Sequence, residues 1–186
     1  MSYSSVCAVV DCQGFQFKDR FVPKEVAIIS ENLSQCQELD MDKLWRVLSL
    51  EDQKVCIYTT KFINGLHHYP FNPREFSYIT KAENIGQVLC TWYQMVASQD
   101  KPLFAFKNQQ LGKILNDLDI PSLNLDSIKN FPTVEQIQTK YGDNYLCAYH
   151  KRPSKTSNVL LTCAYRKSAQ IYREINEIVS ADYEKM

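Results

Sequence analysis

The sequence predicts a single α/β domain in which helices flank a mixed β-sheet. Strand-like apolar segments come first, and segments with helical and strand-like hydrophobic patterns alternate afterwards. A chain of 186 residues is long enough to bury a sizeable hydrophobic core. No repeat, low-complexity stretch or linker divides it, so we expect one domain over residues 1–186.

The N-terminal part of the chain is expected to consist mainly of strands. Residues 5–11 form a nearly continuous apolar run, which is typical of a central buried strand, and residues 24–30 form another. Gly14 indicates a turn over residues 11–15, after which residues 15–17 are a candidate start of a further strand. The region from 31 to 60 is expected to hold a short helix at about 39–48 and a strand at 55–58.

The remainder alternates helices and strands. Apolar residues recur on one helical face between residues 83 and 97, and Thr133 is a good N-cap for a helix. The expected elements are helices over 83–97, 109–118, 133–140 and about 159–179, with strands over 103–106 and 123–126. One arrangement that fits this order is the ribonuclease-H-like architecture, in which three antiparallel strands are followed by parallel crossovers.

Composition and charge narrow the functional class. The formal net charge is zero, so no overall field attracts nucleic acid or an anionic membrane. No apolar run approaches the roughly 20 residues of a membrane span, and residues 1–5 lack the pattern of a signal peptide. Seven scattered cysteines indicate reduced thiols rather than a disulfide framework. We therefore expect an intracellular protein of the cytoplasm or nucleus that does not bind a membrane.

Two cysteines and a histidine near the C-terminus suggest a metal site. Cys147 and His150 are three residues apart, so one turn can direct both at the same point, and Cys163 follows thirteen residues later. Thiolates and imidazole suit zinc, which has four ligands in structural sites. Glu25 is the candidate for the fourth ligand, because an acid at the start of an apolar strand needs a partner. The alternative is core packing, since buried cysteine is common in protein interiors.

Several of these residues also resemble a known family. Residues 9–14 resemble the first motif of the DEDD exonuclease superfamily, in which a strand ends in Asp-x-Glu. Residues 21–27, followed by Cys147-x2-His150 and Cys163-Ala164, more specifically resemble the Maelstrom domain of the piRNA pathway. This resemblance implies a ribonuclease-H-like fold with a Glu-Cys-His-Cys zinc site at Glu25, Cys147, His150 and Cys163. It also implies single-stranded RNA binding in small-RNA-dependent transposon silencing.

The acidic residues argue against exonuclease chemistry. A two-metal nuclease needs about four carboxylates to hold divalent ions some 3.5–4 Å apart. Asp11 is present, but Gln13 replaces the second acid of the motif, and residues 107–111 contain none after the middle strand. Asp126 is a possible third carboxylate in a loop. We therefore expect a structural zinc ion without two-metal catalysis.

A basic segment is the candidate RNA-binding surface. Between residues 147 and 173 the chain has no acid, while Tyr149 and Tyr165 are interleaved with the basic residues. Such a segment can follow a phosphate backbone and stack an unpaired base; the alternative is a solvated helix face and a loop at 153–158. The basic residues are Lys151, Arg152, Lys155, Arg166, Lys167 and Arg173.

An aromatic loop leaves two other functions open. His67 and His68 lie in a loop rich in aromatic residues and proline, but no nucleophile motif accompanies them, so a packed loop is the simpler interpretation. The segment from Leu66 to Phe71 is the candidate docking loop if the protein is an interaction scaffold derived from an inactive nuclease. A non-standard RNA nuclease would have to use Asp11 or the two histidines.

Overall fold

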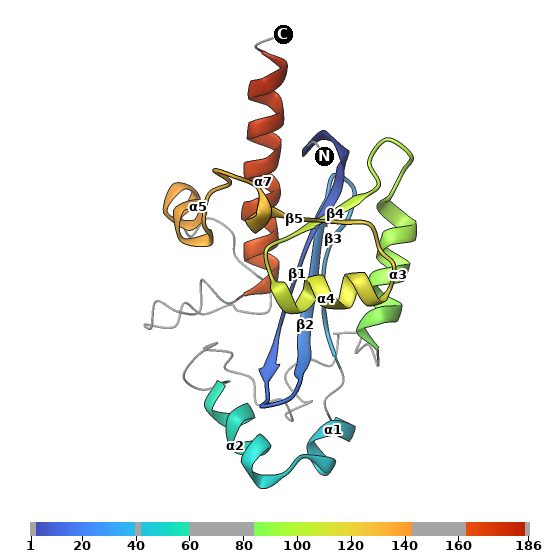
Figure 1. Ribbon diagram of the computed structural model, residues 1–186, viewed down its shortest axis with the longest axis vertical. Coiled ribbons are helices and arrows are strands. Elements are labelled where there is room, and N and C mark those ends of the chain that lie inside the picture. The colour runs from blue at the N-terminus through green and yellow to red at the C-terminus, as the bar shows by residue number, and fades with distance from the viewer. Residues whose placement is uncertain (1–2, 40–41, 60–83, 143–162, 185–186) are drawn as a thin grey trace.

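The computed structural model describes residues 3–39, 42–59, 84–142 and 163–184 (Figure 1). A five-stranded sheet forms its centre, in the order β3-β2-β1-β4-β5. The strands are β1 (Val6–Gln16), β2 (Phe21–Ser30), β3 (Ser34–Glu38), β4 (Leu103–Phe106) and β5 (Ser122–Asn124). The β1–β2 and β2–β3 pairs are antiparallel, whereas β1–β4 and β4–β5 are parallel. This confirms the α/β fold with a mixed sheet and agrees with a ribonuclease-H-like arrangement.

Helices cover both faces of the sheet. They are α1 (Asp42–Val47), α2 (Leu50–Tyr58), α3 (Ile85–Val96), α4 (Gln109–Asp117), α5 (Val134–Tyr141) and α7 (Ala164–Tyr183), with short 3-10 turns at Tyr3–Ser5 and Leu125–Ser127. α3 and α4 lie on one face and α5 and α7 on the other, while α1 and α2 lie beyond the end of the β1–β2 hairpin (Figure 1). In the described parts of the chain, no helix has both the length and the hydrophobicity of a membrane span.

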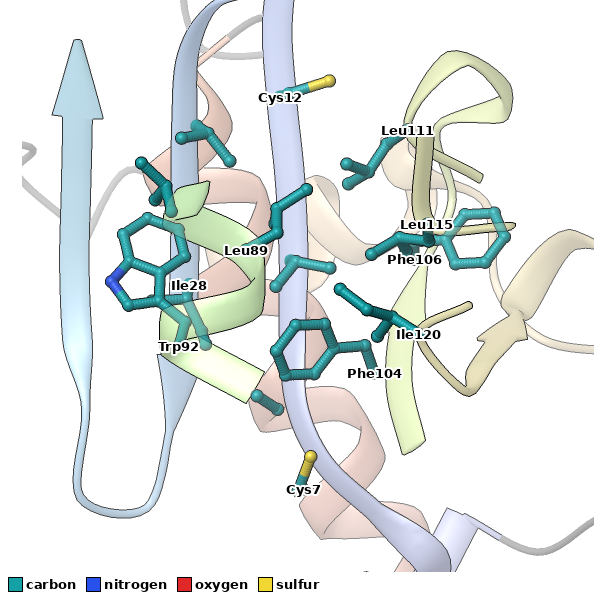
Figure 2. Close-up of a cluster of buried hydrophobic side chains, with 14 residues drawn as sticks. Cys7, Cys12, Ile28, Leu89, Trp92, Phe104, Phe106, Leu111, Leu115 and Ile120 are labelled. Carbon is teal, nitrogen blue, oxygen red and sulfur yellow. The ribbon is translucent and has the colours of Figure 1, made fainter. Parts of the chain in front are cut away.

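Successive side chains of the central strands point to opposite faces of the sheet, so each face has its own hydrophobic core. Figure 2 shows Trp92 of α3 beside Ile28 of β2, and Leu111 of α4 directed toward β1; all belong to one buried cluster with Leu89 and Phe104. On the opposite face, Val9 and Ala105 pack with apolar residues of α5 and α7. α7 therefore lies on the face of β1 that carries the side chains of Val9 and Asp11.

The expected turn at residues 11–15 is wrong, because β1 continues through it to Gln16. The register shifts between Gln13 and Gly14, which is a β-bulge. Gly14 is needed for close approach of the strands, since a Cβ atom there would lie 2.7 Å from the Cα atom of Pro23. The chain turns later, where the amide of Phe17 donates to the carbonyl of Arg20 over 2.8 Å.

The strand expected at 55–58 is also wrong, because these residues belong to α2. Ser49 caps this helix by accepting a 3.1 Å hydrogen bond from the amide of Asp52. Four consecutive apolar residues fit a helix or a strand equally well, so the cap decides between them. The edge strand β3 is not expected from the sequence because its residues are mostly polar.

Candidate metal centre

Glu25 and Cys163 lie together where α7 begins. Glu25 is on β2, and its Oε1 atom accepts a 3.1 Å hydrogen bond from the amide of Ala164, the residue that follows Cys163. Both are buried, with exposed fractions of 8% for Glu25 and 1% for Cys163. Cys147 and His150, the other two expected ligands, lie outside the described residues. Two of the expected ligands are thus near one another, through the contact between the Glu25 carboxylate and the backbone amide that follows Cys163.

The carboxylate of Glu25 also stabilises the start of α7. Cys163 is the N-cap residue, but its side chain makes no capping hydrogen bond, and the first turn contains no acid. Glu25 satisfies one of the amides that every helix N-terminus leaves without an intrahelical partner, and its negative charge suits the helix dipole. Ala164 is fully buried against Ala27 and Cys36, so the first turn packs closely on the sheet.

The described donors fit a zinc ion in their chemistry. The carboxylate of Glu25 and the thiol of Cys163 are both buried, and both are ligand types that zinc accepts. Among the described residues no group of three or more His, Cys, Asp and Glu side chains could hold a metal. A four-ligand set would be completed by Cys147 and His150.

Asp11 forms a buried ion pair with Lys167 of α7. Its Oδ2 atom lies 2.6 Å from the Lys167 Nζ atom, and the two side chains are only 5% and 14% exposed. The oxygen has no hydrogen bond of good geometry, so the ammonium approaches it from outside the favoured directions. The carboxylate that a two-metal nuclease would use on β1 is therefore neutralised by a lysine of the protein itself.

A second lysine neutralises Asp126 at the same edge of the sheet. Lys107 directly follows β4, and its Nζ atom lies 2.5 Å from Oδ1 of Asp126. The same ammonium donates to the carbonyl of Pro132 over 3.2 Å and lies 5.0 Å from the ring centre of Phe131. These contacts hold the loop after β5 and give Asp126 a structural role.

The amide residues of this edge are also used structurally. Asn108 caps α4, since its Oδ1 atom accepts from the amides of Gln110 and Leu111, and its Nδ2 atom donates to the carbonyl of Cys12 over 2.8 Å. Gln110 in turn donates to Gln16 over 3.0 Å. Neutral amides thus tie the end of β4 to β1 where a nuclease would carry further acids.

The described members of the expected basic segment contact the protein. Arg166 is buried and Lys167 pairs with Asp11. Arg173 is half exposed, and its Nε atom donates to Glu177 over 3.1 Å while its guanidinium lies 4.5 Å from the ring centre of Tyr141. Lys151, Arg152 and Lys155, as well as the loop from Leu66 to Phe71 with His67 and His68, lie outside the described residues.

Sequence reasoning misses the role of Lys167. The charge pattern assigns Lys167 to the RNA-binding segment. In the sequence, however, it lies among Ala164, Ser168 and Ile171, which are expected to form the buried face of the last helix. A lysine close to an apolar helical face is a signal that it meets a buried acid. Asp11, left without a second acid in its motif, is the available partner.

Comparisons of the chain with protein-family models, curated proteins and solved structures found no match. The likeness to the Maelstrom domain therefore depends on the quoted residues alone.

Proposed function

We propose that the chain is a non-catalytic ribonuclease-H-like module that binds single-stranded RNA or components of a small-RNA pathway in transposon silencing. The observation that supports the lack of catalysis is the ion pair between Asp11 and Lys167. Two-metal cleavage requires several carboxylates that face divalent ions. Here Asp11 faces Lys167 and Asp126 faces Lys107, so these acids are already neutralised.

Zinc is the proposed structural cofactor. Glu25 and Cys163 would hold it with Cys147 and His150, and the contact between Glu25 and the first turn of α7 supports this set. A bound zinc ion with all four positions filled supplies a cross-link and no open site for water. The cross-link would join β2 to the start of α7, so metal binding would contribute to folding stability.

The RNA-binding part of the proposal depends on Lys151, Arg152 and Lys155, because the described basic residues make contacts within the protein. Three phosphate contacts in a chain of zero net charge imply modest affinity. Counterion release predicts that log K for a single strand falls with log salt with a slope of about −2 for three contacts.

Binding and cleavage can be tested together on a labelled single-stranded oligoribonucleotide. The variant Lys151→Glu/Arg152→Glu/Lys155→Glu is expected to lose at least about tenfold in affinity, by the loss of phosphate contacts. A matched control is Lys54→Glu/Lys113→Glu/Lys129→Glu, which changes the charge equally at exposed positions on other elements. Equal loss in both variants would show that the binding is a non-specific charge effect.

The same protein, with magnesium or manganese added, tests the absence of catalysis. We expect no cleavage of the oligonucleotide and one zinc per chain by elemental analysis. Cleavage that persists through purification and disappears in Asp11→Asn would overturn the non-catalytic assignment and favour a non-standard nuclease. Folded protein without zinc would remove the metal centre from the proposal.

A groove beside α7 favours a second candidate function, an interaction scaffold. Its volume is about 640 Å³, and it lies between α7 and the β2–β3 hairpin. Tyr165 and Tyr172 line it together with Ile29 and Ala169. A complex that survives ribonuclease treatment and is lost in Tyr172→Glu would support a protein ligand in this groove. Loss only on replacement of residues 66–71 would place the ligand at the aromatic loop instead.

A further inference from the structure

Two carboxylates on adjacent strands hold the first turn of α7. Asp11 is paired across the β1–β2 ladder with Ala27, and Gln13 with Glu25, so Asp11 and Glu25 are on the same face. Glu25 accepts the amide of Ala164 over 3.1 Å, and Asp11 meets the ammonium of Lys167 at 2.6 Å. The helix start is thus attached to β2 through its backbone and to β1 through a side chain.

The attachment to β1 is coupled directly to Cys163. The amide of Lys167 donates a 3.1 Å hydrogen bond to the carbonyl of Cys163, which closes the first turn. A displacement of Lys167 therefore moves the backbone of Cys163 with it. The ion pair with Asp11 restricts the rotation of this turn about the helix axis, while the buried contact of Ala164 with Ala27 sets its distance from the sheet.

Local sequence contributes little to the position of this helix start. The N-cap side chain does not cap the helix, and no acid stands in the first turn. Without tertiary contacts the first turn of such a helix frays. Glu25, which accepts the amide of Ala164, is itself a proposed zinc ligand. Asp11, in contrast, holds the turn without belonging to the ligand set.

We propose that Asp11 and Lys167 are positioning residues of the zinc centre, which keep Cys163 beside Glu25. This inference rests on the proposed zinc site. A tetrahedral zinc ion tolerates little displacement of its ligands, and groups that orient ligands from outside the coordination sphere are worth about 10- to 100-fold in metal affinity. The acid that a nuclease would use to bind a catalytic metal would then orient the ligands of a structural one.

The test compares two neutralised ion pairs. Asp11→Asn/Lys167→Met removes the pair without leaving an unpaired buried charge. Lys107→Met/Asp126→Asn is the control, because it removes a second Lys–Asp ion pair at the same edge of the sheet, one in which the Asp126 side chain is 47% exposed. Zinc-loaded protein is titrated with a chromogenic chelator, and the visible spectrum of the cobalt-substituted protein reports the geometry of the cysteine-containing site.

We expect the Asp11/Lys167 variant to release zinc at roughly 10- to 100-fold lower chelator concentration and to show an altered cobalt spectrum. The control should retain the wild-type affinity and spectrum. The charge swap Asp11→Lys/Lys167→Asp should recover part of the affinity, and it provides a second readout if the neutral variant does not fold.

Wild-type affinity and spectrum in the folded Asp11/Lys167 variant would overturn the positioning role while leaving the zinc site intact. An equal loss in the control would also overturn it, because the effect would then be one of general stability. Absence of zinc from the wild-type protein would be a failure of the proposed function itself and is distinguished by elemental analysis.

Discussion

The hydroxyl group of Tyr141 donates a 2.6 Å hydrogen bond to Oε2 of Glu174, and this contact joins α5 to α7. Lys140 donates to the same oxygen over 2.7 Å, and the guanidinium of Arg173 lies 4.5 Å from the centre of the Tyr141 ring. Burial and the hydrogen bond to Glu174 raise the pKa of Tyr141, so the hydroxyl remains a donor. These side chains hold α5 against the helix that forms the candidate metal centre.

Tyr141→Phe is expected to lower the free energy of unfolding by about 1.5 kcal/mol, the lower end of the range for a hydrogen bond to a charged group. The loss stays at the lower end because Lys140 still donates to Glu174. Urea unfolding followed by circular dichroism measures it. Tyr183→Phe, an exposed position on the same helix, is the control and should leave the urea midpoint unchanged.

The pairing of Glu177 predicts a loss of stability in acid. The hydrogen bond from Lys140 is the main cause that lowers the pKa of Glu177 below its ordinary value of 4.5. A lowered pKa in the folded state stabilises the protein above the unfolded pKa, and this contribution disappears as the pH falls through the folded pKa. We therefore expect Glu177→Gln to lower the urea midpoint at pH 7, and the difference from wild type to shrink as the pH falls below 4.5 and to vanish once it is below the lowered pKa of the folded state. An equal difference at pH 7 and below that lowered pKa would contradict the assignment.

The ion pair of Asp11 and Lys167 predicts a large difference between single and double substitution. Lys167→Met leaves a buried carboxylate unpaired, which costs about 3–5 kcal/mol. Asp11→Asn/Lys167→Met removes both charges and should regain most of that loss, since neutral replacement of a buried pair is often close to neutral in stability. Thermal and urea unfolding of both variants measure the stability that the single substitution loses and the part that the double substitution regains. A double variant as unstable as the single one would show that the lysine acts through packing alone.

The bulge in β1 predicts that Gly14 cannot accept a side chain. In Gly14→Ala the new Cβ atom would meet the backbone of Val22 and lie 2.7 Å from the Cα atom of Pro23. Backbone atoms cannot move aside as a side chain does, so we expect a loss of about 1–3 kcal/mol in urea unfolding, typical of overpacking. Gly142→Ala offers a contrast, because a Cβ atom at that position would have no atom within 4 Å and only the φ of +62° disfavours alanine.

The central strands and most helices were predictable because their hydrophobic patterns match their burial. The apolar runs at 26–29 and 103–106 lie in β2 and β4, and Thr133 caps α5 as expected, with Gln136 completing the capping box. The strand β3 was not predictable from its polar sequence, because an edge strand needs little apolar burial. The helix at 55–58 depends on the cap at Ser49, which outweighs the β-propensity of valine and isoleucine.

The candidate site was predictable to a lesser degree. The resemblance groups Glu25 with Cys163 as zinc ligands, which stays a prediction, and in the structure Glu25 accepts the amide of Ala164, the residue after Cys163. The pairing of Asp11 with Lys167 could not be read from either residue alone, since it depends on the register of β1 and on which face of α7 meets the sheet. Tertiary contacts of this kind have no periodic signal in the sequence.

The hydrogen bond between Glu25 and Ala164 spans 139 residues of chain, and this separation has a consequence for biosynthesis. At about 5–20 residues per second, a ribosome needs roughly 7–28 s to make the chain between the two partners. Throughout that interval the nascent β1–β2 hairpin presents the surface reserved for α7, with Asp11 and Glu25 beside exposed apolar side chains. Completion of the native state must await release of the C-terminal helix from the exit tunnel, so truncation before α7 should yield a chain that depends on chaperones to remain soluble.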